Sequence, residues 1–184
     1  MAARERSTTD GEGTYLHVSN KGIEDRLLFN DDEDYAVFLQ FLAGYVTAPK
    51  DPEATKTAFQ VRGRTFSGAP HLPKNYFNKI ELIAYNLAPD HFHLLVHQTD
   101  QGAIENFIRS LCTRYAIYFN KKNQRTGRLF AGPYKSVTIE AGVPLSNLTG
   151  FLHSTGTHTS YLEYLGKRDT PWIKPGVVLC SFNQ

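Results

Sequence analysis

The chain has 184 residues, of which 41% are hydrophobic and 21% are charged, and its formal net charge is only +2. This composition is typical of a globular protein and excludes a chain that is disordered throughout. No apolar run approaches the roughly 20 residues of a membrane-spanning helix, and two cysteines do not make a disulfide framework. We therefore expect one domain in a reducing cytoplasm.

After a polar, flexible tail at 1–13, the hydrophobic pattern predicts a mixture of strands and helices. Apolar residues at every second position indicate strands, and spacings of three and four residues indicate helices. The acidic run 31–34 should cap a helix, because carboxylates favour the first helical turn. The elements expected in chain order are a strand at 14–20, a helix at 31–46, strands at 79–87 and 91–98, a helix ending near 122, a strand at 134–139, a helix from 144 to 152 and helical turns at 157–165.

The segment 48–78 breaks this pattern with repeated Pro and Gly. We expect an irregular insertion there, with a short strand at 58–61. The tail at 170–173 is expected to pack back onto the body. Residues 14–184 are therefore predicted to form a single α+β domain, with an antiparallel central sheet and helices mainly on one face.

The run His91-Phe92-His93 is the strongest chemical signal in the chain. Side chains alternate between the two faces of a strand, so the two imidazoles share one face and Phe92 points to the other. Two neighbouring imidazoles make half of a divalent-metal site. The alternative is a pair of ordinary strand histidines. His97 lies on the same face, either as a spare ligand or as a partly exposed strand residue.

Between 109 and 135 every charged residue is basic, and aromatic residues are interleaved with the cations. Cations neutralise phosphates and aromatic rings stack on unpaired bases, so the segment suits single-stranded nucleic acid. A solvated helix face with core aromatics is the alternative interpretation. The residues expected to contact DNA are Arg109, Arg114, Tyr118, Lys121, Lys122, Arg125, Arg128, Tyr134 and Lys135.

Several ordered segments together resemble one family, the HUH single-tyrosine transposases, and in particular its REP-associated tyrosine transposases. The resemblance covers nearly the whole chain except the tail and the insertion. The segments that carry it are 15–22, 32–39, 87–95, 114–122, 125–130, 132–136, 161–166 and 170–172.

The resemblance implies an HUH, ferredoxin-like fold and a homodimer that binds single-stranded or hairpin DNA. It also implies that His91, His93 and a third polar side chain hold Mg²⁺ or Mn²⁺, although two imidazoles alone would equally accept Zn²⁺. In the family a helix-borne tyrosine attacks the phosphate and forms a 5′-phosphotyrosine, with the metal acting as Lewis acid.

The chain departs from the family at this helix. Phe151 stands at the position of the nucleophilic tyrosine, and Thr155 stands at the position of the third metal ligand. Gly150 replaces an arginine and Gly156 a proline. Phenylalanine has no hydroxyl, so we expect a domesticated or inactivated transposase that binds DNA without strand transfer, with Phe151 packed against the body.

Three alternatives stay open. The chain could be an active nuclease or transposase that uses Tyr161 or Tyr164, with Tyr118 and Tyr134 as weaker candidates. An RNA-binding regulator on the same scaffold is another, because stacking and basic residues do not distinguish ribose from deoxyribose. A metal enzyme of another class is the least favoured, because Asp90 is the one carboxylate near the histidines and is expected to cap its turn. His153 could reach a metal if its helix were distorted. If the protein is bacterial, we expect it at the nucleoid.

Overall fold

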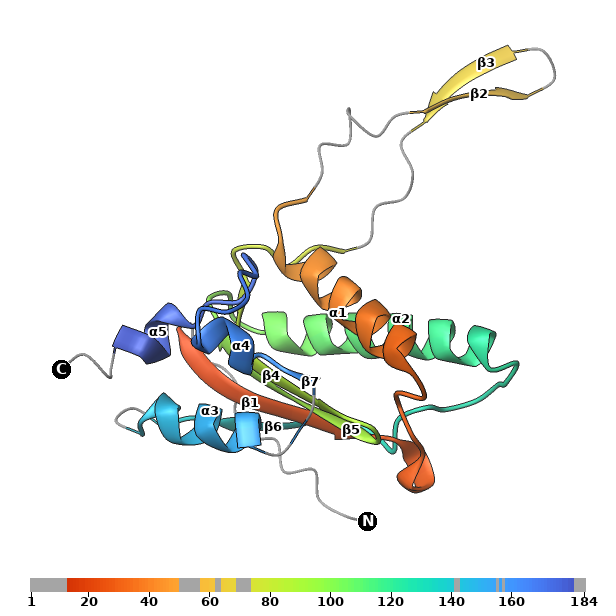
Figure 1. Ribbon diagram of the computed structural model, residues 1–184. Coiled ribbons are helices and arrows are strands. Elements are labelled where there is room, and N and C mark those ends of the chain that lie inside the picture. The colour runs from red at the N-terminus through yellow and green to blue at the C-terminus, as the bar shows by residue number, and fades with distance from the viewer. Residues whose placement is uncertain are drawn as a thin grey trace.

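The computed structural model describes residues 13–49, 57–61, 64–68, 74–140, 143–154, 156 and 158–180, with the backbone alone at 57–61 and 64–68. Its centre is a five-stranded antiparallel sheet in the order β6-β1-β5-β4-β7 (Figure 1). The strands are β1 (Thr14–Lys21), β4 (Ile80–Ala88), β5 (His91–Gln98), β6 (Lys135–Thr138) and β7 (His158–Thr159).

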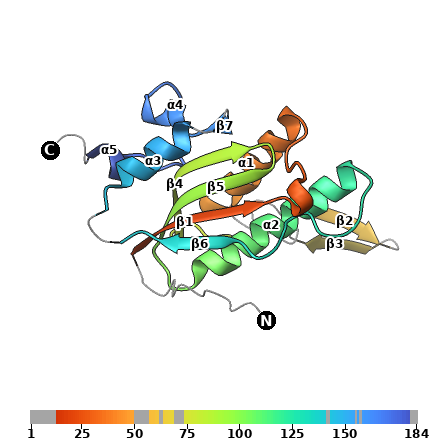
Figure 2. The same ribbon diagram turned by 90° about the horizontal axis from the view of Figure 1, so that it is seen from below.

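The two long helices, α1 (Asp32–Val46) and α2 (Ala103–Lys122), lie together on one face of the sheet (Figure 1). On the opposite face α3 (Leu145–Ser154) lies over the β4 end, as Figure 2 shows from below. Short helices complete the body: η1 (Ile23–Asp25), α4 (Tyr161–Tyr164) and α5 (Gly176–Leu179). The fold is the α+β architecture expected from the sequence.

The main core fills the space between the sheet and the two long helices. Phe92, Leu94 and Val96 of β5 point into it and are fully buried, together with Phe38 of α1 and Tyr115 of α2. Burying these side chains removes them from water and fixes which face of β5 is inside. The intervening residues of β5, including both histidines of the motif, therefore face the other way.

A smaller core lies on the α3 face of the sheet. The register of β4 against β5 shifts between Leu82 and Ala84, and this bulge lets the successive residues Ile83 and Ala84 both face α3. Leu152 of α3 and Val178 of α5 pack against them. This contact attaches α3 to the sheet.

The acidic run at the start of α1 has the structural role expected from its position. The Asp31 side chain accepts a hydrogen bond from the Asp34 amide at 3.1 Å, as an N-cap residue should. The tail also packs back as expected, since Trp172 stacks on Tyr85 and Ile173 forms a bridge to Leu82.

Two expectations differ from the structure. Residues 158–159 are not helical but pair with Leu87 and Asn86 of β4 as β7, because this short segment completes the sheet edge before α4 begins. Within 48–78, two strands rather than one form a separate two-stranded sheet, β2 (Thr57–Val61) with β3 (Arg64–Gly68). The tail at 1–12 lies outside the described residues. No helix in the described part of the chain has the length and apolarity to cross a membrane.

Candidate functional site

His91 and His93 face the same side of β5, and their ring centroids are 5.1 Å apart at an interplanar angle of 83°. They open into a cavity of about 390 Å³ that Lys21 and Lys135 also line. We refer to this space as the histidine cavity. Its lining residues are Ser19, Asn20, Lys21, His91, His93, Ala131, Gly132, Pro133 and Lys135. Two imidazoles and two lysines line one space, and the exposed Lys21 ammonium lies 3.0 Å from Asp25 Oδ1. This lining suits an anionic ligand, because an exposed ion pair is weak enough for a phosphate to replace the carboxylate.

Asp90 orients the first histidine of the motif. Its carboxylate accepts a hydrogen bond at 2.7 Å from Nδ1 of His91, and this bond leaves Nε2 as the nitrogen with a lone pair. The sequence predicted that Asp90 would cap its turn, so its bond to the imidazole is a correction. A carboxylate behind an imidazole is a usual arrangement around metal-binding histidines.

His17 on β1 is a partner that the sequence analysis missed. Its Nε2 lies 2.9 Å from Nδ1 of His93, and the two rings stack with centroids 5.0 Å apart. Burial lowers the pKa of His17, and burial together with the neighbouring His17 and His91 lowers the pKa of His93 to about 4. Both rings are therefore neutral near pH 7. The alternation of β1 placed His17 on one face with Ser19, but only the pairing of β1 with β5 brings it to His93.

The residues around the histidine cavity fit a divalent cation in part. His91 and His93 are imidazoles of the kind that bind such ions, and the lowered pKa of His93 keeps a lone pair on its ring. Within the described residues there is no group of three or more His, Cys, Asp or Glu side chains that could hold a metal. Thr155, at the family's third ligand position, lies outside the described residues. Oxygen ligands from water or phosphate would complete such a shell.

Phe151 does not pack as we expected. It is 54% exposed on α3, and its neighbours Leu152 and Thr149 are buried instead. Leu152, and not Phe151, is the residue of α3 that packs against Ile83 and Leu95 of the sheet. The apolar side chain thus stands at the surface.

Tyr161, Tyr164 and His153 lie together, and none of them lines the histidine cavity. The His153 ring lies 4.7 Å from the Tyr164 ring and 5.5 Å from the Tyr161 ring. The Tyr164 hydroxyl donates to the Ile83 carbonyl at 3.1 Å, and burial raises its pKa. His153 Nε2 lies 3.0 Å from Ser160 Oγ. Their contacts are those of packing residues.

His97 also has a structural environment. Its Nδ1 lies 2.8 Å from Oε2 of Glu81 on β4, and its ring stacks on Tyr15 of β1 with centroids 4.5 Å apart. Strand register places it four residues from His93, at the opposite end of β5. It does not line the histidine cavity.

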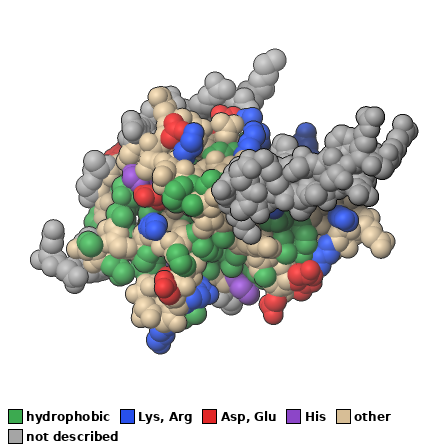
Figure 3. Space-filling view, turned by 90° about the horizontal axis from the view of Figure 1, so that it is seen from above, with side chains coloured by type: hydrophobic (Ala, Val, Ile, Leu, Met, Phe, Trp, Pro, Cys, Tyr) green, Lys and Arg blue, Asp and Glu red, His purple; other side chains and the backbone are tan. Residues whose placement is uncertain are grey.

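The DNA contacts expected from the basic run at 109–135 do not form one continuous strip, because these residues face different parts of the fold. Three of them stabilise the contact between α1 and α2. The Arg114 guanidinium lies 4.1 Å from the Phe41 ring centroid, and the Tyr118 hydroxyl donates to Asp34 at 3.0 Å. Lys122 forms ion pairs with Asp31, Glu33 and Asp34 at 2.7–3.0 Å. Although burial opposes its charge, these bonds raise the Lys122 pKa. On the side of the molecule shown in Figure 3, the visible Lys and Arg side chains are likewise separated by acidic, apolar and other polar ones.

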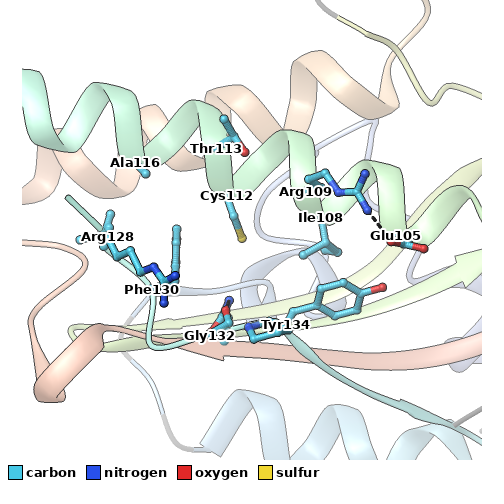
Figure 4. Close-up of a pocket in the computed structure, with 13 residues that line it drawn as sticks. Glu105, Ile108, Arg109, Cys112, Thr113, Ala116, Arg128, Phe130, Gly132 and Tyr134 are labelled. Carbon is cyan, nitrogen blue, oxygen red and sulfur yellow. Dashed lines mark hydrogen bonds and ion pairs between the residues drawn. The ribbon is translucent and has the colours of Figure 1, made fainter. Parts of the chain in front are cut away.

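The remaining members of the run divide between two cavities and the end of α2. Lys135 lines the histidine cavity. Arg109, Arg128 and Tyr134 line a second cavity of about 500 Å³ beside α2, shown in Figure 4. We refer to it as the α2 cavity. Lys121 is exposed near the end of the helix, where Arg125 bonds the Asn120 side chain at 2.9 Å.

Comparisons with known proteins match part of the chain to a family model and its fold to a solved structure. Residues 74–154 match the family model described as Transposase IS200 like. The structure of a REP-associated tyrosine transposase bound to a REP hairpin is similar over 94% of this chain and 81% of its own, with a TM-score of 0.52 and 12% identity. A protein from Deinococcus radiodurans R1, assigned as a transposase, matches over 86% of this chain and 99% of its own, with a TM-score of 0.44 and 15% identity. No curated protein matches the chain.

The chain is a transposase-like protein whose residues 74–154 resemble the IS200-like transposases. The match to the family model includes β4, β5 and α2 and so contains both histidines of the motif. The first structural neighbour shares the fold. The resemblance inferred from the sequence is thereby confirmed.

Proposed function

We propose that the protein binds single-stranded or hairpin DNA and does not carry out tyrosine-mediated strand transfer. The observation that carries the proposal is that His91, His93, Lys21 and Lys135 line one cavity. Lysines attract a phosphate, and the imidazole pair is positioned beside it. The REP hairpin bound to the first structural neighbour supports DNA as the polyanion.

His91 and His93 are also the residues proposed to hold Mg²⁺ or Mn²⁺. A divalent ion bound there would act as Lewis acid on the phosphate. Asp90 and His17 would keep the two imidazoles oriented through their Nδ1 atoms. Lys135 and Lys21 would neutralise the phosphate charge.

The loss of strand transfer is proposed from Phe151, which has no hydroxyl, and from the positions of the nearby tyrosines. The Tyr164 hydroxyl is bonded to a backbone carbonyl, and Tyr161 does not line the histidine cavity. The phosphate would therefore be bound without a tyrosine nucleophile beside it. Arg109, Arg128, Tyr134, Lys121 and Arg125 are proposed as further DNA contacts. Arg114, Tyr118 and Lys122 are proposed as structural residues.

DNA binding is tested by titrating a labelled DNA hairpin that carries a single-stranded extension, with a blunt duplex of the same composition as control. We expect tighter binding of the hairpin and an affinity that falls linearly with salt on logarithmic scales, because phosphate contacts release counterions. Equal affinity for the duplex, or binding that does not change with salt, would overturn the proposal. Preference for a matched RNA hairpin would replace DNA by RNA.

The absence of strand transfer is tested with Mn²⁺ and the same hairpin by searching for a covalent adduct that survives SDS. We expect none from the natural chain. Phe151→Tyr should also give none, because it restores one of several altered positions in the helix. An adduct that disappears in Tyr161→Phe or Tyr164→Phe would show an active enzyme instead.

A homodimer and an association with the nucleoid are proposed on the family resemblance. Light scattering of the purified protein measures the first, and DNA-dependent localisation of a fluorescent fusion measures the second. A monomer at all concentrations, or a fusion spread evenly through the cell, would contradict them.

A further inference from the structure

The α2 cavity adjoins the histidine cavity, because Asn20, Gly132 and Pro133 line both. The two cavities open on opposite faces of the sheet, since His91 and His93 point away from the α2 side, and the shared residues at the end of β1 and in the loop before β6 form the ridge between them. A chain molecule bound at the histidine pair could therefore cross this ridge and place its next group in the α2 cavity. We propose that the α2 cavity receives one unpaired base of the bound DNA, an inference that rests on the proposed function.

The walls of the α2 cavity suit the flat, apolar face of a base. Figure 4 shows Phe130 and Tyr134 on opposite sides, with the Cys112 side chain pointing from α2 toward the space between them. Ile108 and Ala116 of α2 extend the apolar lining. Burial raises the pKa of the Cys112 thiol to about 12, so the thiol stays neutral and adds no charge to this wall. Aromatic side chains stack on bases of any sequence.

A guanidinium lies near each end of the cavity, Arg128 at one and Arg109 at the other (Figure 4). Guanidinium groups form paired hydrogen bonds with phosphate, so two of them suit the sugar-phosphate backbone on either side of a base. Arg109 forms an ion pair with Glu105 one turn earlier, but both side chains are more than 60% exposed. Such an exposed ion pair contributes little to the stability of the fold, and a phosphate can replace the Glu105 carboxylate as the partner of Arg109.

Polar groups at the ridge and on α2 can bond the edge of a base. The Asn20 side chain donates to the Gly132 carbonyl at 3.3 Å and reaches both cavities, and Thr113 adds a hydroxyl. The volume of about 500 Å³ lies within the range of roughly 300–1,000 Å³ usual for small-molecule sites. A simple anion would not need the two aromatic walls, and an apolar ligand would not need the two arginines. A base with its flanking phosphates uses both.

The experiment compares two labelled hairpins, one with an oligothymidylate extension and one whose extension has the same backbone without bases. For the natural chain, removing the bases should weaken binding roughly 5- to 150-fold, the value of one base stacked on an aromatic side chain. Tyr134→Ala should weaken binding of the thymidylate probe and should no longer distinguish the two probes. Tyr134→Phe keeps the ring and should still distinguish them.

Two further variants keep the test independent of folding and of phosphate binding. Ala116→Phe fills the cavity from α2 without removing a wall and should also abolish the distinction. Tyr161→Ala, at an exposed tyrosine that lines neither cavity, should preserve it. Thermal unfolding confirms that each variant is folded.

The outcomes distinguish a failure of the proposed DNA binding from a failure of the proposed base site. If no probe binds in a salt-dependent way, the proposed function fails and the base site fails with it. If both probes bind the natural chain equally, or if both Tyr134→Ala and Ala116→Phe still distinguish them, the base site is overturned and DNA binding stands. Loss of the distinction in both variants, with Tyr161→Ala unchanged, supports the proposal.

Discussion

Nε2 of His17 lies 2.9 Å from Nδ1 of His93, with the two rings stacked at an interplanar angle of 18°. A neutral imidazole has one donor and one acceptor nitrogen, so one ring must donate to the other. If His93 donates, its Nε2 keeps a lone pair; if His17 donates, that nitrogen carries the proton. His17 therefore decides whether His93 can bind a cation through Nε2, as Asp90 does for His91.

The first prediction concerns this pair. For His93 to bind Mn²⁺ through Nε2, its Nδ1 must donate to His17. His17→Phe keeps a stacked ring but removes this acceptor, so the affinity for Mn²⁺ should fall about 10- to 100-fold, as for other residues that orient metal-binding histidines. Isothermal titration calorimetry with Mn²⁺ measures it. His97→Phe is the control, because His97 bonds Glu81 and does not line the histidine cavity. Equal losses in both variants would contradict a specific role for His17.

The second prediction separates two lysines of the basic run. Lys135→Ala should lower DNA affinity and make the salt dependence shallower by about one unit of logarithmic slope, because one phosphate contact is lost. Lys122→Ala should instead lower the melting temperature, because Asp34, which is fully buried, loses its ion-pair partner. Anisotropy titrations over a range of salt and thermal unfolding measure both variants. If Lys122→Ala lowered the DNA affinity and Lys135→Ala lowered the melting temperature, Lys122 would be the lysine that faces the DNA.

The third prediction concerns two glycines near α3. A Cβ at Gly156 would lie 2.0 Å from Oδ1 of the buried Asn86, so Gly156→Ala should destabilise the fold by roughly 1–3 kcal/mol. A Cβ at Gly150, an exposed position inside α3, meets nothing within 4 Å. Gly150→Ala should therefore stabilise the fold by roughly 0.5–1 kcal/mol. Urea unfolding measures the free energy of unfolding of both variants. If both substitutions changed it in the same direction, the close approach of Gly156 to Asn86 would be refuted.

The fourth prediction concerns pH and Glu163. Burial disfavours its charge, but hydrogen bonds from Arg168 and Thr170 at 2.7 Å hold its pKa below the ordinary value of 4.5. Glu163→Gln should cost roughly 2 kcal/mol near neutral pH, because hydrogen bonds to a charged group are lost.

The sign of the pH effect follows from the lowered pKa. As pH falls below about 4.5, the unfolded chain takes up the proton first, so the stabilisation by Glu163 is lost through the folded pKa. The difference in unfolding free energy between the natural chain and Glu163→Gln should therefore shrink between about pH 6 and about pH 3. A difference that stays constant would exclude an ionised Glu163 as its source.

The sequence by itself determined most of the elements, though not β7 or the pairing of β2 with β3, and the direction of the key side chains. Strand alternation placed His91 and His93 on one face because Phe92 had to enter the core, and the acids before α1 predicted an N-cap at Asn30 or Asp31, of which the structure has Asp31. These are local effects of backbone geometry and hydrophobic burial, which a short run of residues specifies.

Only the tertiary structure decided which distant residues meet. The pairing of β1 with β5 brought His17 next to His93, which is 76 positions away in the sequence. The packing of α2 on α1 placed the Lys122 ammonium within ion-pair distance of three carboxylates. A run of one charge does not reveal which of its members face a helix, a cavity or solvent. That division depends on long-range packing, because each side chain takes its partner from whichever element the fold places beside it.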